Sequence, residues 1–319
     1  MQRIGFRHQR TLRTAASVRG VGIVAGSRVC LRFLPAPENT GLVFVRTDLP
    51  YRPMTPARAD RVTGTNRRTT LGTAETGVTL VEHVLAALSG LRIDNCRIEL
   101  DAAEPPGLDG SAAGFVEALR HAGTVLQADR RPVWSPNSPI VLAQGGATIA
   151  LYPNADAQAG CRVSYTLDYG LRSPIERQTF TTAVTPAAFA RDVSHCRTFL
   201  LEHETDALRR QGVGRHLTAS ELLVFGPRGV IDNTLRHADE PARHKVLDLI
   251  GDLALCGVDV SGHIVAYRSG HSLNVALARA VGERVARATV QDDDAPDTEG
   301  VILPTRGFLP RRHRRQEAA

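Results

Sequence analysis

Two short segments of the sequence combine histidine and carboxylate side chains in a pattern that suits a metal ion. In Val81-Glu82-His83 a carboxylate is followed directly by an imidazole. His244 and Asp248 are four residues apart, so a helix would place both on one face, one turn apart. Imidazole nitrogen and carboxylate oxygen are common ligands of Zn²⁺. We therefore predict that His83, His244 and Asp248 bind one zinc ion, with a fourth position left for water, as in catalytic sites.

Three further residues complete a possible hydrolase site. Glu82, beside a predicted ligand, is placed to take a proton from water. His271 follows Ser269-Gly270 in a predicted loop and would supply a proton or a positive charge. Asp252, one turn beyond Asp248, would orient His271 and raise its pKa. Taken singly, these segments also fit a surface Glu-His pair, a helical salt-bridge face and a loop histidine without a role. Their combination favours a metal-dependent hydrolase.

The elements that must position these residues occur in two similar series. Strand-like runs lead to helical spacing at 79–88 in the first half, and again at 241–255 in the second. The segment QADRRPVWSPNSP between the halves has three prolines and no periodicity, which is typical of a linker. We predict an α+β protein of two domains, each a sheet covered by helices, with the site at their interface. The predicted bounds are 1–127 for the N-terminal domain, 128–138 for the linker and 139–319 for the C-terminal domain and its tail.

Composition narrows the function classes. The chain has 319 residues, 42% of them hydrophobic and 23% charged, which suffices for a large core. The net charge of +6 comes from scattered residues without a nucleic-acid motif, so no nucleic-acid partner is expected, although a basic binding protein is the non-enzymatic alternative. Of 39 basic residues, only Lys245 is a lysine. The five cysteines form no Cys-x-x-Cys, and no signal peptide or membrane span is evident, which predicts a cytoplasmic protein.

Several segments, in order along the chain, resemble one known family. The sequence is similar to UDP-3-O-acyl-N-acetylglucosamine deacetylases, zinc amidases of lipid A biosynthesis, from about residue 9 to residue 280. The segments that carry the resemblance are TLVEHVLAALSGLRIDN (79–95), EPPGLDGSAAGFV (104–116), CRTF (196–199), RHKVLDLIGDL (243–253) and SGHSLN (269–274). The weaker segments PAPENTG (35–41) and VRTDL (45–49) also fit.

The resemblance implies a fold and a set of roles. The fold would be two domains, each a two-layer α/β sandwich, and the protein would be a monomer. The substrate would be a UDP-linked acylated amino sugar, whose acetamide is hydrolysed to release acetate. The resemblance repeats the roles given above for the zinc ligands, Glu82, His271 and Asp252. It adds Thr198 as a hydroxyl donor to the oxyanion, Lys245 as a substrate and transition-state contact, and Phe199 as a sugar contact. It also implies an apolar passage for the acyl chain, lined by Leu201, Thr205 and Val213.

Three segments depart from the family pattern. Residues 22–26 lack the histidine of the usual Leu-His-Ser/Thr-Gly turn and have Val24 in this region. Asp168-Tyr169-Gly170 replaces Asp-Phe/Tyr-x-His-Pro, and Thr205 is polar where an aliphatic residue is usual. These changes leave the predicted zinc chemistry intact and affect the substrate fit. A divergent paralogue acting on another N-acetylated sugar is therefore the alternative enzyme function.

Overall fold

The computed structural model of the chain describes residues 1–154 and 160–292, apart from 211, 213, 215, 219 and 220. It confirms the predicted α+β class, because helices pack against sheets that are mainly antiparallel. The helices are α1 (Glu82–Gly90), α2 (Ala113–Ala122), α3 (Pro186–Ala188), α4 (Glu202–Arg210), α5 (Glu240–Leu253) and α6 (His271–Asp292). Within the described residues, no helix has the length and apolar character needed to cross a bilayer.

The first half of the chain forms a five-stranded sheet with the order β2-β3-β9-β4-β5. Its strands are β2 (Ala16–Val21), β3 (Arg28–Pro35), β4 (Leu42–Arg46), β5 (Met54–Pro56) and β9 (Cys96–Leu100). In β3 the hydrophobic residues at every second position are buried, as expected for a strand with one face toward a core. One of them, Phe33, makes an edge contact with Phe115 of α2, with ring centroids 6.3 Å apart. Helices α1 and α2 thus share a core with this sheet.

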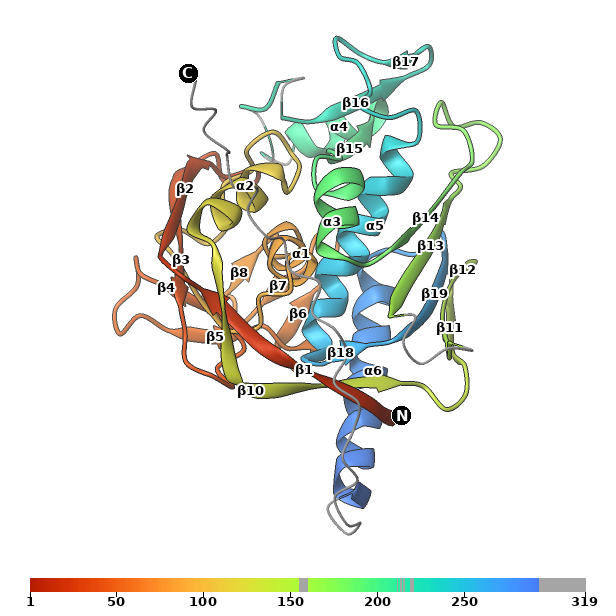
Figure 1. Cartoon of the computed structure of the whole chain (residues 1–319). Helices are drawn as coiled ribbons and strands as arrows, with labels where there is room; N and C mark the ends of the chain where they lie inside the picture. The colour runs from red at the N-terminus through yellow and green to blue at the C-terminus, as the bar shows by residue number, and fades with distance from the viewer. Residues whose placement is uncertain (155–159, 211, 213, 215, 219–220, 293–319) are drawn as a thin grey trace, which may run out of the picture.

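The second half forms another five-stranded sheet, with the order β11-β12-β19-β13-β14. Its strands are β11 (Ile140–Gln144), β12 (Ala147–Tyr152), β13 (Cys161–Leu167), β14 (Gln178–Ala183) and β19 (Gly262–Tyr267). Helix α5 packs on β13 and β14, and α6 packs on β11 and β12. In Figure 1 the two sheets stand on opposite sides of the molecule, with α1 and α5 between them.

Two long antiparallel strands run from one half of the molecule to the other. They are β1 (Gln2–Leu12) and β10 (Thr124–Ser135), and the short β18 (Asp259–Val260) pairs with β10 in parallel. Strand β10 includes most of the segment 128–138, which the sequence predicts as a linker. The buried guanidinium of Arg7 binds both Asp94 and Asp259, and so adds an ionic connection between the halves.

The central helices α1 and α5 approach each other very closely. A Cβ atom at Gly251 of α5 would lie only 2.0 Å from the carbonyl oxygen of Glu82, so only glycine fits at this contact. The close approach brings the first turn of α1 against the middle of α5. The two predicted ligand segments are therefore adjacent, although they are far apart in the sequence.

Smaller sheets complete the fold. Helix α4 begins at Glu202, because the three residues before it, Phe199–Leu201, pair in parallel with residues 223–225. One three-stranded sheet comprises β15 (Phe199–Leu201), β16 (Leu223–Gly226) and β17 (Gly229–Val230). Another comprises β6 (Val62–Gly64), β7 (Thr70–Leu71) and β8 (Val78–Thr79). A single π-helical turn at Phe189–Val193 and 3-10 turns at Ala59–Arg61 and Ala254–Cys256 connect the larger elements.

Candidate metal centre and active site

The structure brings together the three residues predicted to bind zinc. The Nε2 atoms of His83 and His244 each lie 3.5 Å from the same carboxylate oxygen, Oδ1 of Asp248. The two imidazole rings meet edge to face, with centroids 5.1 Å apart. All three donor atoms lie within 4.8 Å of one another. Two imidazole nitrogens and one carboxylate oxygen converging in this way fit a divalent ion of the zinc class.

The helices hold these ligands in fixed orientations. His83 is the second residue of α1, whereas His244 and Asp248 lie one turn apart on α5, as their spacing predicts. His244 Nδ1 is 3.1 Å from the carbonyl oxygen of Cys196, and a hydrogen bond there leaves Nε2 as the nitrogen free to bind a cation. Burial lowers the pKa of His244 to about 3, despite the neighbouring Asp248 carboxylate. The imidazole is therefore neutral at physiological pH, as a metal ligand must be.

Lys245 holds the second oxygen of the Asp248 carboxylate. Its Nζ donates to Oδ2 at 2.9 Å and also lies 5.3 Å from the centre of the Phe199 ring. Burial raises the pKa of Asp248, but His244 and Lys245 outweigh that effect and keep it well below its usual value. Asp248 is therefore ionised, with one oxygen toward the imidazoles and the other toward an ammonium group.

A second group of polar side chains lies beside the ligand cluster. His271 Nδ1 is 2.8 Å from Asp252 Oδ2, and its Nε2 is 4.0 Å from Glu82 Oε1. The prediction that His271 lies in a loop is wrong: it is the first residue of α6. The helix begins there because the backbone N–H of Asn274 donates to the carbonyl of Gly270. The start of a helix fixes the imidazole more firmly than a loop would.

Burial and charge make Glu82 and His271 an acid–base pair. Burial raises the pKa of Glu82, and the nearby His271 opposes that shift only in part. For His271, burial favours the neutral form, but Asp252 and then Glu82 outweigh it and raise the pKa to about 10. His271 is therefore a cation near neutral pH, while Glu82 accepts a proton more readily than an ordinary carboxylate.

Thr198 and Phe199 connect this centre to β15. The Phe199 ring lies edge-on to His244, with centroids 6.0 Å apart, and also contacts Tyr169 and Phe225. The Thr198 hydroxyl donates to the carbonyl of Gly110 at 3.0 Å. The structure thus places Phe199 against the ligand cluster. The Thr198 hydroxyl, predicted to donate to the oxyanion, instead donates to a backbone carbonyl in this structure.

The residues predicted for an acyl passage are less closely arranged. Leu201 is half-buried at the end of β15, and the Thr205 hydroxyl on α4 donates to the carbonyl of Glu202 at 2.6 Å. Val213 lies outside the described residues. In the turn that departs from the family pattern, the backbone N–H groups of Val24 and Ala25 donate to the buried Glu104 carboxylate.

Two residues of the site were not found by sequence reasoning. Thr69 donates its hydroxyl to Asp252 at 2.6 Å and its backbone N–H to Glu82 at 3.0 Å, so it contacts both carboxylates. Asn274 donates to Asp252 at 2.9 Å. Asn274 is the last residue of the segment SGHSLN. If the predicted helix had been extended back to His271, Asn274 would have been placed one turn from His271, on the same face. Nothing in the segment RRTT distinguishes Thr69 from other threonines.

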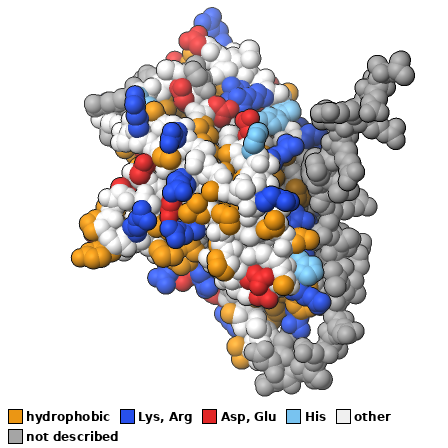
Figure 2. All heavy atoms as spheres, turned by 60° about the vertical axis from the view of Figure 1, so that its left-hand side comes forward, with side chains coloured by type: hydrophobic (Ala, Val, Ile, Leu, Met, Phe, Trp, Pro, Cys, Tyr) orange, Lys and Arg blue, Asp and Glu red, His pale blue; other side chains and the backbone are white. Residues whose placement is uncertain are grey.

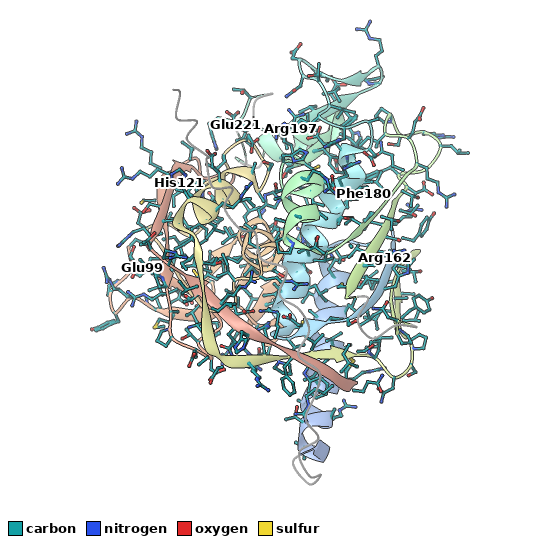
Figure 3. The ribbon with its side chains drawn as sticks, in the orientation of Figure 1. Glu99, His121, Arg162, Phe180, Arg197 and Glu221 are labelled. Atoms are coloured by element: carbon teal, nitrogen blue, oxygen red, sulfur yellow. The ribbon has the colours of Figure 1, made fainter. Side chains whose placement is uncertain are left out.

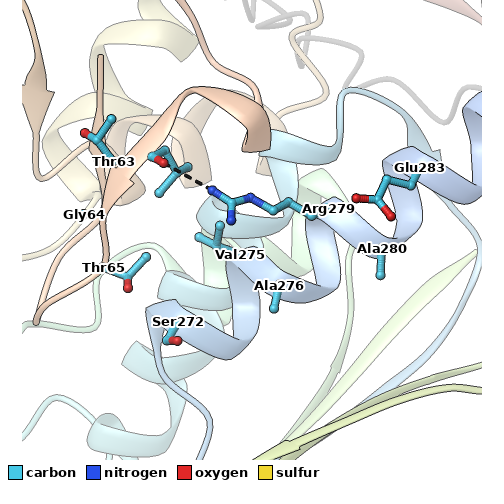
Figure 4. A pocket seen from close by; sticks show the side chains of 10 residues that line it. Thr63, Gly64, Thr65, Ser272, Val275, Ala276, Arg279, Ala280 and Glu283 are labelled. Atoms are coloured by element: carbon cyan, nitrogen blue, oxygen red, sulfur yellow. Dashed lines mark hydrogen bonds between the residues drawn. The ribbon is translucent and has the colours of Figure 1, made fainter. Parts of the chain in front are cut away.

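Two surface features lie apart from this centre. The pocket in Figure 4 is formed by residues 62–65 and one face of α6 around Arg279, and it includes none of the predicted site residues. Arg279 crosses it to donate to the carbonyls of Ala59 and Val62. On the face shown in Figure 2, Lys and Arg side chains are scattered among acidic and hydrophobic ones and form no continuous strip.

Comparison with known proteins agrees with this geometry. The model of the UDP-3-O-acyl N-acetylglycosamine deacetylase family matches residues 9–283. A UDP-3-O-acyl-N-acetylglucosamine deacetylase of Trichormus variabilis is 40% identical over 278 residues, covering 86% of this chain and 98% of its own. The protein of the same name from an Anaeromyxobacter species is 39% identical over 302 residues, covering 93% of this chain and 97% of its own.

The fold and the His-His-Asp group define an α+β protein with a candidate metal centre, in agreement with these matches. The chain belongs to the UDP-3-O-acyl N-acetylglycosamine deacetylase family. The resemblance stated from the sequence motifs is therefore confirmed.

Proposed function

We propose that this chain hydrolyses the acetamide of a UDP-3-O-acyl-N-acetylglucosamine and releases acetate, a reaction of lipid A biosynthesis. The observation that carries the proposal is the convergence of His83, His244 and Asp248 beside the buried Glu82–His271 pair. The names of the relatives support the same substrate. Family membership alone would leave the catalytic groups undefined, and the distances among these side chains support the roles that we propose for them.

The metal we propose is Zn²⁺, held by His83, His244 and Asp248. When bound, it supplies a Lewis acid that polarises the acetamide carbonyl and makes water more acidic. The donor set contains no thiolate, and its two imidazoles and one carboxylate would leave a position for substrate or water. Lys245 holds the outer oxygen of Asp248 and supplies a positive charge toward an anionic substrate.

The chain's own residues carry the proton transfers. Glu82 removes a proton from the attacking water, which its raised pKa favours. His271 presents Nε2 to the substrate, because Asp252 holds Nδ1. The protonated imidazole stabilises negative charge on the carbonyl oxygen, and either it or Glu82 then protonates the leaving amine. The Thr198 hydroxyl adds a donor to that oxygen after turning away from the Gly110 carbonyl.

The test is acetate release from UDP-3-O-acyl-N-acetylglucosamine, together with metal analysis of the same preparation. We expect turnover that is lost on metal removal and restored by Zn²⁺. A panel of other N-acetylated sugars distinguishes the alternative, a paralogue with a shifted substrate, which the turn at Val24 and the polar Thr205 motivate. Turnover of a sugar without an acyl chain, but not of the acylated one, would establish that alternative.

The domain division and the cellular setting belong to the same proposal. We propose domains at 1–127 and 139–319 joined by 128–138, supported by one five-stranded sheet in each half. We also propose a cytoplasmic monomer, supported by the free, widely spaced cysteines. Light scattering would test the monomer. Limited proteolysis that cleaves within 128–138 and leaves two stable fragments would support the division.

A further inference from the structure

A second group of metal-ligating side chains lies outside the proposed active site, where the segment before β15 meets the segment before α5. It consists of His195, Cys196 and His237, whose donor atoms all lie within 4.8 Å of one another. The two Nε2 atoms are 2.6 Å apart, and the ring centroids are 4.9 Å apart. Cys196 is buried, whereas both imidazoles are half-exposed.

The surrounding contacts hold the two segments together. Arg197, labelled in Figure 3, forms a buried ion pair with Glu240, with Nε 2.9 Å from Oε1. Arg236 Nη1 donates to the carbonyl of His195 at 2.6 Å. These two contacts hold the backbone segments that carry His195, Cys196 and His237 next to each other. Such preorganisation is what a metal site requires of its protein.

The protonation of these groups is compatible with ligation of a cation. Burial, His237 and Arg236 all lower the pKa of His195, so its imidazole is neutral and keeps a lone pair for a cation. Burial and then Glu240 raise the pKa of Cys196 to about 12, so without a cation it is a thiol, which donates to the Asp192 carbonyl. A bound cation, in contrast, deprotonates a thiol that it ligates.

We propose that His195, Cys196 and His237 form a second cation site for a divalent ion of the zinc class. Two imidazoles and one thiolate suit zinc and cobalt, and the half-exposed imidazoles leave the remaining position to solvent. A hydrogen bond between the two imidazoles would account for His195 and His237 alone. That hydrogen bond does not involve the Cys196 sulfur, which lies within 4.8 Å of a ring nitrogen of each histidine.

The second site would contact the first through one residue. The side chain of Cys196 would bind the outer cation, while its carbonyl oxygen contacts His244 Nδ1 at 3.1 Å. A cation on the sulfur would therefore fix the backbone group that orients a ligand of the inner site. The proposal does not rest on the catalytic function, because it concerns binding by groups outside the inner cluster.

Cobalt distinguishes the two sites, because the inner cluster contains no sulfur. We would titrate the metal-stripped full chain with Co²⁺ and record the near-ultraviolet thiolate-to-cobalt charge-transfer band. The expected result is a band in the wild type and in His83→Ala, which lacks an inner ligand, and loss of the band in Cys196→Ser and His237→Gln. Matched controls are Cys30→Ser, which removes another thiol, and His121→Gln, which removes an exposed imidazole on α2 (Figure 3). Both controls should keep the band.

Two results would overturn the proposal: no band in the wild type, or a band that survives Cys196→Ser. Because Cys196 is buried, its replacement could unfold the chain, which circular dichroism would reveal. The half-exposed His237 then provides the decisive variant, and a full band in His237→Gln would count against the site. Failure of the catalytic proposal would be recognised separately: the charge-transfer band would be present, but the protein would show no metal-dependent acetate release.

Discussion

The helices α1 and α5 hold their functional residues in a different way from the β15–α4 segment, although Phe199 of β15 touches His244 of α5. On α5, His244, Asp248 and Asp252 are at most 3% exposed, and each contacts at least one polar partner within 3.1 Å. On α4, the hydrogen bond of the Thr205 hydroxyl to a described residue goes to a carbonyl of its own helix. The comparison indicates that tertiary contacts fix the reacting groups. In contrast, Thr205, which is proposed to line the acyl passage, is held by a hydrogen bond within its own helix. Substrate preference can then change without disturbing the chemistry.

The largest effect should follow loss of a ligand on α5. His244→Ala removes one of three donors and should abolish tight cation binding, since the two remaining donors no longer enclose an ion. We expect kcat/KM to fall by about 10³-fold or more, because a Lewis acid and its charge are both lost. Metal analysis and acetate release would measure this. His121→Ala, an exposed replacement on α2, is the control, and a His244→Ala protein with full metal content would contradict the assignment.

Glu82→Gln separates the base from the ligands. The amide keeps the shape and can still accept the Thr69 N–H, but it cannot take a proton from water. Loss of a general base typically lowers kcat by about 10²–10⁴-fold, and we expect the cation to be retained. Steady-state kinetics and metal content together distinguish this outcome. Activity close to wild type would assign the base to another group.

Asp252→Asn tests how His271 is kept charged. In the wild type the carboxylate raises the pKa of His271 to about 10, so the cation is present at lower pH and is lost as the pH rises through that value. Without the Asp252 charge, only Glu82 and Asp248 oppose the effect of burial, so the pKa of His271 falls. We expect the alkaline limb of the kcat/KM–pH profile to move to lower pH. Asn274→Ala removes a neutral donor to Asp252 and the acceptor of the Ser269 hydroxyl, but no charge, and should shift that limb much less.

The same contrast explains how much of the molecule could be predicted from sequence. The i, i+4 spacing of His244 and Asp248 is a local property of a helix, so the sequence predicted their shared face. Thr69 could not be found, because its contacts with Glu82 and Asp252 arise only when a loop packs against α1 and α5. The strand at Phe199–Leu201 was missed for a similar reason, because its partner lies more than twenty residues later. The segment 128–138 looks like a linker by its prolines, and only the pairing of β10 with β1 reveals a strand.

A fourth prediction concerns the close approach of the central helices. In Gly251→Ala the new methyl group would meet the Glu82 carbonyl, and overpacking of this kind costs about 1–3 kcal/mol. Gly282→Ala on α6 is the matched helical control, because its nearest neighbour would be at 3.6 Å, an ordinary contact. The control should be neutral or stabilised by up to about 1 kcal/mol, since alanine favours helix. Urea denaturation measures both, and equal stabilities would show that the α1–α5 contact relaxes easily.

The smallest effect on activity is expected from a substitution on α4, because the comparison predicts that this helix tolerates substitutions. Thr205→Val replaces a hydroxyl by a methyl group of similar size and removes the bond to the Glu202 carbonyl. If this residue lines the acyl passage, burying one added methyl group against the chain is worth about 0.8 kcal/mol, or roughly a fourfold lower KM. Thr289→Val on α6 removes the same kind of bond, to the carbonyl of Val285, and should leave KM unchanged. A substrate with a shortened acyl chain sharpens the test, because the gain should disappear with it. An equal gain on both substrates would mean that Thr205 acts on the helix and not on the acyl chain.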